Sequence, residues 1–244
     1  GTSCGTAAHP DREMAQLNAA LELAEHDAVG IWWFNKLECP SVPLERLKSG
    51  GADELFRWLS GRHRQTLVLR LATDLPVHPV AAISFDRTGK WLAYGFCARL
   101  ALTDAMIGAV LEMLQCEISL SAMSRRASTV ASSESDVPAL LHWSAGSDIE
   151  KILGSGRVPE PDNQCNEMTY PADRFVNDIR SMGTYVADIT REDIGVPVVR
   201  VISSQLRDWM PRFAKGRLYD LPVELGLRNR ALTEEKLNED RIVV

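Results

Sequence analysis

Apolar and polar positions along the chain follow two periods. A spacing of three to four residues is typical of helices, whereas alternation or a short apolar run is typical of strands. The helical spacing predicts helices over residues 10–29, 53–59, 107–115, 139–151 and 174–182. Short runs rich in Val, Ile and Leu, bounded by Gly, Pro and Asp, predict strands over residues 66–72, 77–83, 91–100, 184–189 and 198–202. Because helices and strands alternate, we expect an α/β fold with a mixed sheet and packed helices.

The boundaries of these elements follow from capping and breaking residues. Pro10 suits the first turn of a helix, and Thr103-Asp104 suits a cap before the third predicted helix. Residues 121–137 are rich in Ser and Ala and contain Arg125-Arg126, so we expect a mobile or weakly structured segment there. We expect a loop over residues 154–163 and an irregular tail over residues 226–244.

Two of the predicted helices carry the same narrow polar stripe. Asn18, Glu22 and Glu25 fall within about 60° of one helical face, at roughly 100° per residue. Glu112 and Gln115 repeat the second half of this stripe 90 residues later, again on a nearly all-apolar helix. The repetition predicts two pseudo-repeated halves, each built from helix and strands.

The stripe has two interpretations. In the first, the stripe is the solvent-facing side of mostly buried helices, which is the usual case because Glu is rarely buried unless paired. Alternatively, Glu22, Glu25 and Glu112 bind Mg²⁺, which prefers oxygen ligands and often bridges carboxylates and substrate phosphates. The recurrence in one register supports the second interpretation, but both remain open from spacing alone.

Composition narrows the class of protein. A net charge of −6 and a pI near 5.5 argue against nonspecific nucleic-acid binding. The five cysteines are scattered without a C-x-x-C pair, which is typical of the reducing cytoplasm and indicates neither a zinc site nor a disulfide framework. No apolar run approaches about 20 residues, so we expect no membrane span.

Several segments resemble one family. Residues 21–29 with Trp32-Trp33-Phe34-Asn35 resemble the E-x-x-E-R-D-A…W-W-Y-N segment of the YcaO family, and in particular of its azoline-forming cyclodehydratases. Residues 188–202 are similar to that group's D-L-T-R-x-D-I-G-x-P-V-V-R-V-I block, and residues 216–223 to its G-R-L-Y-D-V-P-V block. Residues 95–100 also match, and all matches occur in family order. The resemblance predicts a single YcaO-like domain over residues 1–244.

The resemblance implies an enzyme of bacteriocin-type peptide modification with ATP and Mg²⁺ as cofactors. In that family a Cys, Ser or Thr side chain of a precursor peptide attacks the preceding backbone carbonyl, and ATP phosphorylates the resulting oxyanion. Loss of phosphate leaves a thiazoline or oxazoline ring. The implied partners are a ribosomally made precursor peptide, a leader-binding protein or domain, and a flavin-dependent azoline dehydrogenase, with a homodimer left open.

The resemblance also implies the site residues. By position, the nucleotide and metal motifs fall on Asn18, Glu22, Glu25, Glu112, Gln115 and Arg200, with Asn18 in place of the family's Ser. The metal ligands among them are Glu22, Glu25 and Glu112, and no residue is assigned a covalent catalytic role. Considered alone, Arg200 is better explained as a surface cation at the end of a strand, because most Arg side chains are exposed.

The chain departs from the family pattern in three places. His26 stands where the family has Arg, the family domain begins before this chain does, and the tail lacks the Pro-rich ending of many members. We therefore expect the chain to lack the N-terminal part of the domain. An inactive YcaO-like module that binds a precursor peptide or a partner protein is the alternative function.

Overall fold

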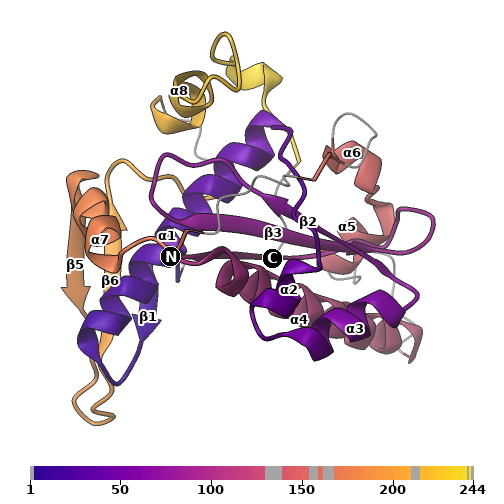
Figure 1. Ribbon diagram of the computed structural model, residues 1–244, viewed down its shortest axis with the longest axis horizontal. Helices are drawn as coiled ribbons and strands as arrows, with labels where there is room; N and C mark the ends of the chain where they lie inside the picture. Colours follow the sequence, from indigo (N-terminus) through magenta and orange to yellow (C-terminus); the bar gives the residue numbers. More distant parts are fainter. Residues whose placement is uncertain are drawn as a thin grey trace.

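The computed structural model describes residues 3–129, 139–153, 159–161, 168–209, 215–240 and 242. Within them lie two three-stranded sheets (Figure 1). One has the order β2 (Gln65–Arg70), β3 (His78–Phe85), β4 (Ala93–Arg99). The other has the order β1 (Thr6–Ala8), β6 (Val198–Ser203), β5 (Thr184–Asp188). The α/β class is confirmed, but these strands pair antiparallel in two sheets and not in one mixed sheet.

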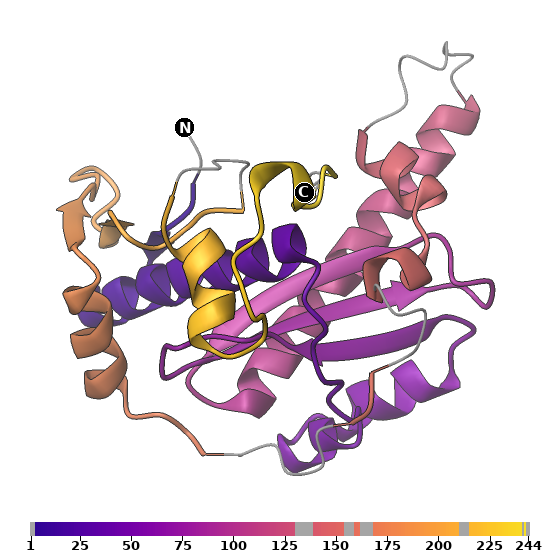
Figure 2. The same ribbon diagram turned by 90° about the horizontal axis from the view of Figure 1, so that it is seen from above.

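Two long helices cover opposite faces of the β2-β3-β4 sheet. On β3, Ala81 and Ile83 pack in the cluster that contains the second half of α1 (Arg12–Asn35). The alternating positions Val80 and Ala82 pack with α4 (Leu102–Thr129). Every residue of β3 is buried, as a strand between two helical layers must be. The first half of α1 contacts β1 and β6, so this helix joins the two sheets (Figure 2).

Helix α1 begins and ends at identifiable caps. Asp11 caps it, and its carboxylate accepts hydrogen bonds from the Glu13 and Met14 N–H groups at 2.8 and 3.4 Å. The helix ends at Lys36, which has a left-handed φ of 49°. It begins two residues after Pro10 and continues through the aromatic run beyond Val29. Trp32 and Trp33 are 3% and 6% exposed, so they pack in the core as this run suggests.

The remaining described helices lie around this framework. They are α2 (Arg46–Ser49), α3 (Asp53–Gly61), α5 (Ala139–Gly146), α6 (Ile149–Leu153), α7 (Ala172–Ser181), α8 (Arg217–Glu224) and the 3₁₀ turn η2 (Glu234–Lys236). A single helix was expected over residues 139–151, but the structure has two: α5 ends at Gly146 and α6 follows it. Strand β1 and helix α8 were not expected from the sequence, and α8 contains Pro222 in its interior.

Helix α4 differs most from its sequence expectation. It begins at Leu102, so Thr103 and Asp104 lie in its first turn, and it continues to Thr129. The expectation of weak structure is therefore wrong for residues 121–129, where Ala and Met sustain the helix. Residues 130–137 of that segment lie outside the described residues, as do 154–158 and 162–163 of the expected loop. By length and composition Leu102–Arg126 would also suit a membrane span, but here α4 packs along β4 and β3.

The C-terminal segment has little regular structure but is attached to the core. Over residues 226–240 and 242 only the turn η2 is regular. Leu237 is 3% exposed, and the Asn238 N–H donates to the Phe34 carbonyl at 2.8 Å. Trp33 Nε1 donates to the Asp240 carbonyl at 2.7 Å. The expected irregular tail thus packs against the end of α1.

Candidate functional site

The carboxylates of α1 and α4 meet at strand β4. Strand β4 is the edge of its sheet, and the Phe96 N–H donates a 2.7 Å hydrogen bond to Glu112 Oε2 of α4. Helix α4 can approach this closely because Gly95 has no side chain. A Cβ there would lie 2.7 Å from the carbonyl carbon of Glu112 and closer still to Met113 N and Ala109 O. This close contact brings Glu112 to the edge that α1 also reaches.

Glu25 of α1 is buried within this junction. Glu25 is only 9% exposed. The polar stripe at this position is therefore not a solvent-facing side of the helix. Burial above all, together with the charges of Glu112 and Glu22, raises the pKa of Glu25 to about 8, although Arg99 opposes the rise. Glu25 is therefore in the electrostatic range of both other carboxylates that the stripe predicted.

Glu22 and Glu112 share this environment. Burial raises the pKa of Glu22, the Thr6 and Gly5 N–H groups partly offset this, and the charge of Glu112 raises the pKa again. Burial likewise raises the pKa of Glu112, against the effects of the Phe96 N–H and of Arg99. Like charges held together in a partly buried volume favour a bound cation or a bound proton.

The donor set fits a hard divalent cation. All three side chains offer carboxylate oxygens, which is the chemistry of Mg²⁺ and not of thiophilic metals. Arg99, at the end of β4, supplies positive charge beside two of them. Arg99 falls within the matching block of residues 95–100, but nothing in its spacing along the sequence connects it with Glu25.

Arg200 lies beside this cluster on the second sheet. Its strand β6 pairs with β1, where Arg200 is opposite Thr6. It lines a cavity of about 390 Å³ together with Cys4, Leu23 and Asp208. Glu22 and Arg200 both act on the pKa of the Cys4 thiol, in opposite directions. The cavity therefore lies next to the carboxylate cluster, with the Arg200 guanidinium in its lining.

The other two predicted residues lie at the margins. Asn18 is half-buried on α1, one turn before Glu22 and so about 6 Å further along the axis. Gln115 is exposed on α4, three residues after Glu112. The structure thus places Glu22, Glu25 and Glu112 within electrostatic range of one another, and the binding roles of all the predicted site residues stay predictions.

A second polar cluster adjoins Glu22. His26 Nδ1 lies 3.0 Å from Asp208 Oδ1, and its ring stacks on Trp209 with centroids 3.6 Å apart. His26 Nε2 lies 3.9 Å from Glu22 Oε1. Sequence reasoning singled out His26 only as a departure from the family, because its partners follow 182 residues later.

The block over residues 216–223 contacts α1 through a cluster of ionic hydrogen bonds. Arg217 Nη2 donates to both Asp27 and Asp74 at 2.7 Å, and Asp27 also accepts from the Arg207 N–H at 2.7 Å. Asp27 is fully buried. Although burial lowers the pKa of Arg217, the bonds and charges of the two carboxylates raise it overall. This ionic cluster fixes α1 to α8 and does not contact the carboxylates of the site.

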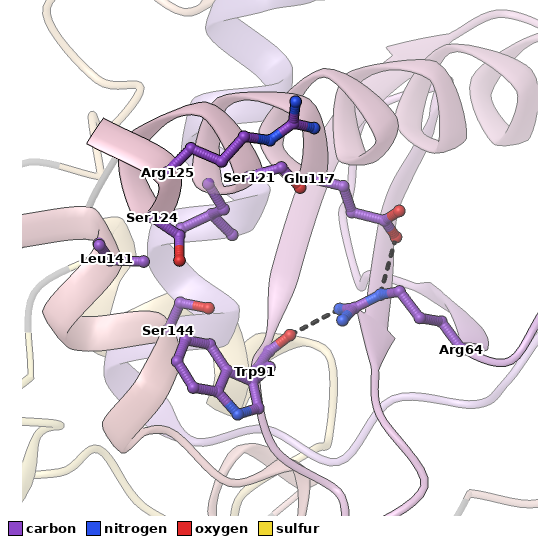
Figure 3. Close-up of a pocket in the computed structure, with 9 residues that line it drawn as sticks. Arg64, Trp91, Glu117, Ser121, Ser124, Arg125, Leu141 and Ser144 are labelled. Carbon is purple, nitrogen blue, oxygen red and sulfur yellow. Dashed lines mark hydrogen bonds and ion pairs between the residues drawn. The ribbon is translucent and has the colours of Figure 1, made fainter. Parts of the chain in front are cut away.

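A separate cavity of about 390 Å³ lies along the second half of α4 (Figure 3). Arg64 lies across it, bonded to Glu117 at 3.3 Å and to the Trp91 carbonyl at 2.6 Å. Trp91 is exposed and has a left-handed φ of 56°, which is rare for a bulky residue. Ser144 and Arg125 also line this cavity.

Solved structures of similar fold were found. A heterocyclase in complex with substrate and cofactor matches with a TM-score of 0.81 and 28% identity, covering 99% of this chain and 33% of that one. The heterocyclase TruD matches with a TM-score of 0.75 and 28% identity, covering 100% and 34%. This chain thus spans about a third of their length.

A more distant structure is YcaO from Methanopyrus kandleri bound with AMPPCP and Mg²⁺, with a TM-score of 0.59, 21% identity and coverage of 85% and 56%. This likeness shows the fold alone. No curated protein matches the chain. The family model described as YcaO cyclodehydratase, ATP- and Mg²⁺-binding, matches residues 1–207, and the chain therefore belongs to the YcaO family.

Proposed function

We propose that this chain is the nucleotide- and Mg²⁺-binding domain of an ATP-dependent peptide cyclodehydratase. The observation that carries the proposal is that Glu22, Glu25 and Glu112, from two helices, lie within electrostatic range of one another: burial raises the pKa of each, and the charge of Glu112 raises those of Glu22 and Glu25 further. Burying several carboxylates close together destabilises a fold unless a bound cation neutralises their charge.

In this proposal each residue has a defined task. Glu22, Glu25 and Glu112 would hold Mg²⁺, which would neutralise charge on the phosphates of ATP. Arg200 would donate to phosphate oxygens from the adjoining cavity, and Asn18 and Gln115 would contact the nucleotide from the margins. Because phosphoryl transfer needs positioning and charge more than covalent chemistry, a site without a nucleophile suits it.

The proposed reaction forms a ring in a peptide backbone. A Cys thiol or a Ser or Thr hydroxyl attacks the preceding amide carbon and loses its proton, and the former carbonyl oxygen takes the γ-phosphoryl group of ATP. The amide N–H then loses its proton as the C–O bond breaks. The products are a thiazoline or oxazoline, ADP and inorganic phosphate, so the oxygen lost from the amide leaves as phosphate.

The substrate and partners follow from this reaction. We propose a ribosomally made precursor peptide, a leader-binding partner, and a flavin-dependent azoline dehydrogenase that could oxidise the product. The hydroxyl- and Arg-lined cavity along α4 is where we place peptide residues that flank the reacting one. We also propose a cytoplasmic location, which agrees with the unpaired Cys4, Cys39, Cys97 and Cys116.

Calorimetric titration with Mg·ATP tests the proposal. The wild-type chain should bind, and Glu22→Gln and Glu112→Gln should each weaken binding at least tenfold, since each removes a charged ligand. Glu13→Gln, at an exposed position in the first turn of α1, is the control and should bind normally. Wild-type protein that is folded but shows neither heat of binding nor a nucleotide-dependent thermal shift would support the inactive peptide-binding module instead.

A further inference from the structure

Three segments far apart in the sequence place metal-ligating side chains together outside the carboxylate cluster. Cys4 precedes β1, His26 lies on α1, and Asp208 follows β6. One ligand atom from each lies within 4.8 Å of the other two. Cys4 and His26 are each 7% exposed, and Asp208 is half-buried at the cavity that Arg200 lines. The cluster is thus partly enclosed but open to solvent on one side.

The geometry needs only a small adjustment to hold an ion. Ligand atoms around a tetrahedral zinc, at bond lengths of about 2.0–2.3 Å, lie roughly 3.3–3.8 Å apart. His26 Nδ1 and Asp208 Oδ1 are already 3.0 Å apart. The Trp209 ring stacked on His26 holds the imidazole in place, so rotation of the Cys4 side chain would close the site.

The donor set differs in kind from the neighbouring carboxylates. Thiolate, imidazole and one carboxylate are the ligands of Zn²⁺ and similar thiophilic ions, whereas Mg²⁺ takes oxygen. Three protein ligands leave a fourth position for water. Neither the spacing nor the number of cysteines predicts this site, since its members follow no short motif.

Charge around Cys4 also favours a cation. Burial above all, together with the charges of Asp208, Glu22 and Glu25, raises the pKa of the thiol to about 12. The same carboxylates that disfavour a bare thiolate attract a dication, and the dication in turn stabilises the thiolate. Burial lowers the pKa of His26, which keeps its imidazole neutral and able to bind a metal.

We propose that Cys4, His26 and Asp208 form a second cation site that binds thiophilic divalent ions of the Zn²⁺ class, next to the carboxylate site and chemically distinct from it. The proposal does not depend on cyclodehydratase activity. It predicts one thiophilic ion per chain, held with Cys4 as its sulfur ligand, which millimolar Mg²⁺ does not displace.

Cobalt titration of the reduced, chelator-treated protein tests this directly. Co²⁺ should produce a sulfur-to-cobalt charge-transfer band in the near ultraviolet and visible bands of a tetrahedral ion, saturating at one equivalent and disappearing when Zn²⁺ is added. Cys4→Ser should abolish the charge-transfer band, and Asp208→Asn should weaken Co²⁺ binding at least tenfold. Circular dichroism checks that each variant is folded.

Two controls separate the site from its surroundings. Cys116→Ser, at the half-buried cysteine of α4, should retain the full band. Glu112→Gln should also retain it, although it weakens Mg·ATP binding under the proposed function. A band that survives Cys4→Ser, or no charge-transfer band in folded wild-type protein, would overturn the proposal. If Cys4→Ser does not fold, undiminished Co²⁺ affinity in Asp208→Asn would overturn it equally.

Discussion

Replacing Gly95 with Ala should separate the two helices that carry the proposed site. An added Cβ would lie 2.7 Å from the carbonyl carbon of Glu112 and closer to two further backbone atoms of α4. Ordinary contact begins at 3.4 Å. Backbone cannot rotate away as a flexible side chain can, so α4 must retreat from β4 by more than 0.7 Å, the difference between those two distances.

The cost can be estimated from the packing. Overpacking of a well-packed core typically costs 1–3 kcal/mol, and a clash with backbone falls at the upper end, about 3 kcal/mol. For a chain of this size each kcal/mol lowers Tm by roughly 2–4 °C, so we expect a fall of about 6–12 °C. Retreat of α4 also lengthens the 2.7 Å bond between the Phe96 N–H and Glu112, and should weaken Mg·ATP binding at least tenfold.

Gly61 supplies the matched control. It is the last residue of α3, and a Cβ there would meet nothing within 4 Å. Gly61→Ala should leave Tm unchanged or raise it by a few degrees, because Ala loses less backbone entropy in a helix. Differential scanning calorimetry and Mg·ATP titration measure both effects. If Gly95→Ala melts within 2 °C of wild type and binds nucleotide equally well, the close packing of α4 does not position Glu112.

Three further predictions concern single side chains. Since the pKa of Glu25 is raised to about 8 from an ordinary value near 4.5, the metal-free fold binds a proton that the unfolded chain releases. Its stability should therefore fall as pH rises from about 4.5 to 8, by on the order of 5 kcal/mol, and urea unfolding of Glu25→Gln should lack this fall. Asp27→Asn should destabilise the fold by about 3 kcal/mol, because it leaves Arg217 buried with one carboxylate fewer, whereas the control Asp74→Asn, at a one-third-exposed side chain, should cost only about 1 kcal/mol by thermal denaturation. Equal losses would show that burial does not set the strength of this ionic cluster. Arg200→Gln should weaken Mg·ATP binding about tenfold in calorimetry while Arg200→Lys loses less, and equal affinity in all three proteins would remove Arg200 from the nucleotide site.

The spacing of apolar residues predicted most of the helices and strands, because burying one face of a helix or strand imposes that spacing. Strands β2, β3 and β4 lie within two residues of their expected bounds, whereas helix α1 begins two residues after its expected start and ends six residues beyond its expected end. The three residues of β1 are too few to show a period, and β1 exists because it pairs with β6. Pairing of strands depends on tertiary packing, so the alternation of elements could not show that two antiparallel sheets replace one mixed sheet.

The same limit applies to the site. Glu22, Glu25 and Glu112 could be found from sequence because each helix repeats its own stripe, and resemblance to a family connected the two. Cys4 and Asp208 follow no such pattern. They come together beside His26 only because α1 packs against β1 and β6 in the folded chain. Clusters assembled from single residues of distant segments become visible only in three dimensions.

Two independent contacts set the position of the carboxylates. Gly95 fixes how closely α4 lies to β4, and the ionic cluster around Arg217 fixes α1 against α8. Mg²⁺ requires its oxygen ligands near 2.1 Å in nearly octahedral geometry, so an error of one ångström in either helix would remove a ligand. The block over residues 216–223, which resembles a family signature, contains no carboxylate of the cluster, and its contribution is to hold the helix that carries Glu22 and Glu25. Loss of Arg217 should therefore weaken metal binding through the position of α1 and not through the loss of a ligand.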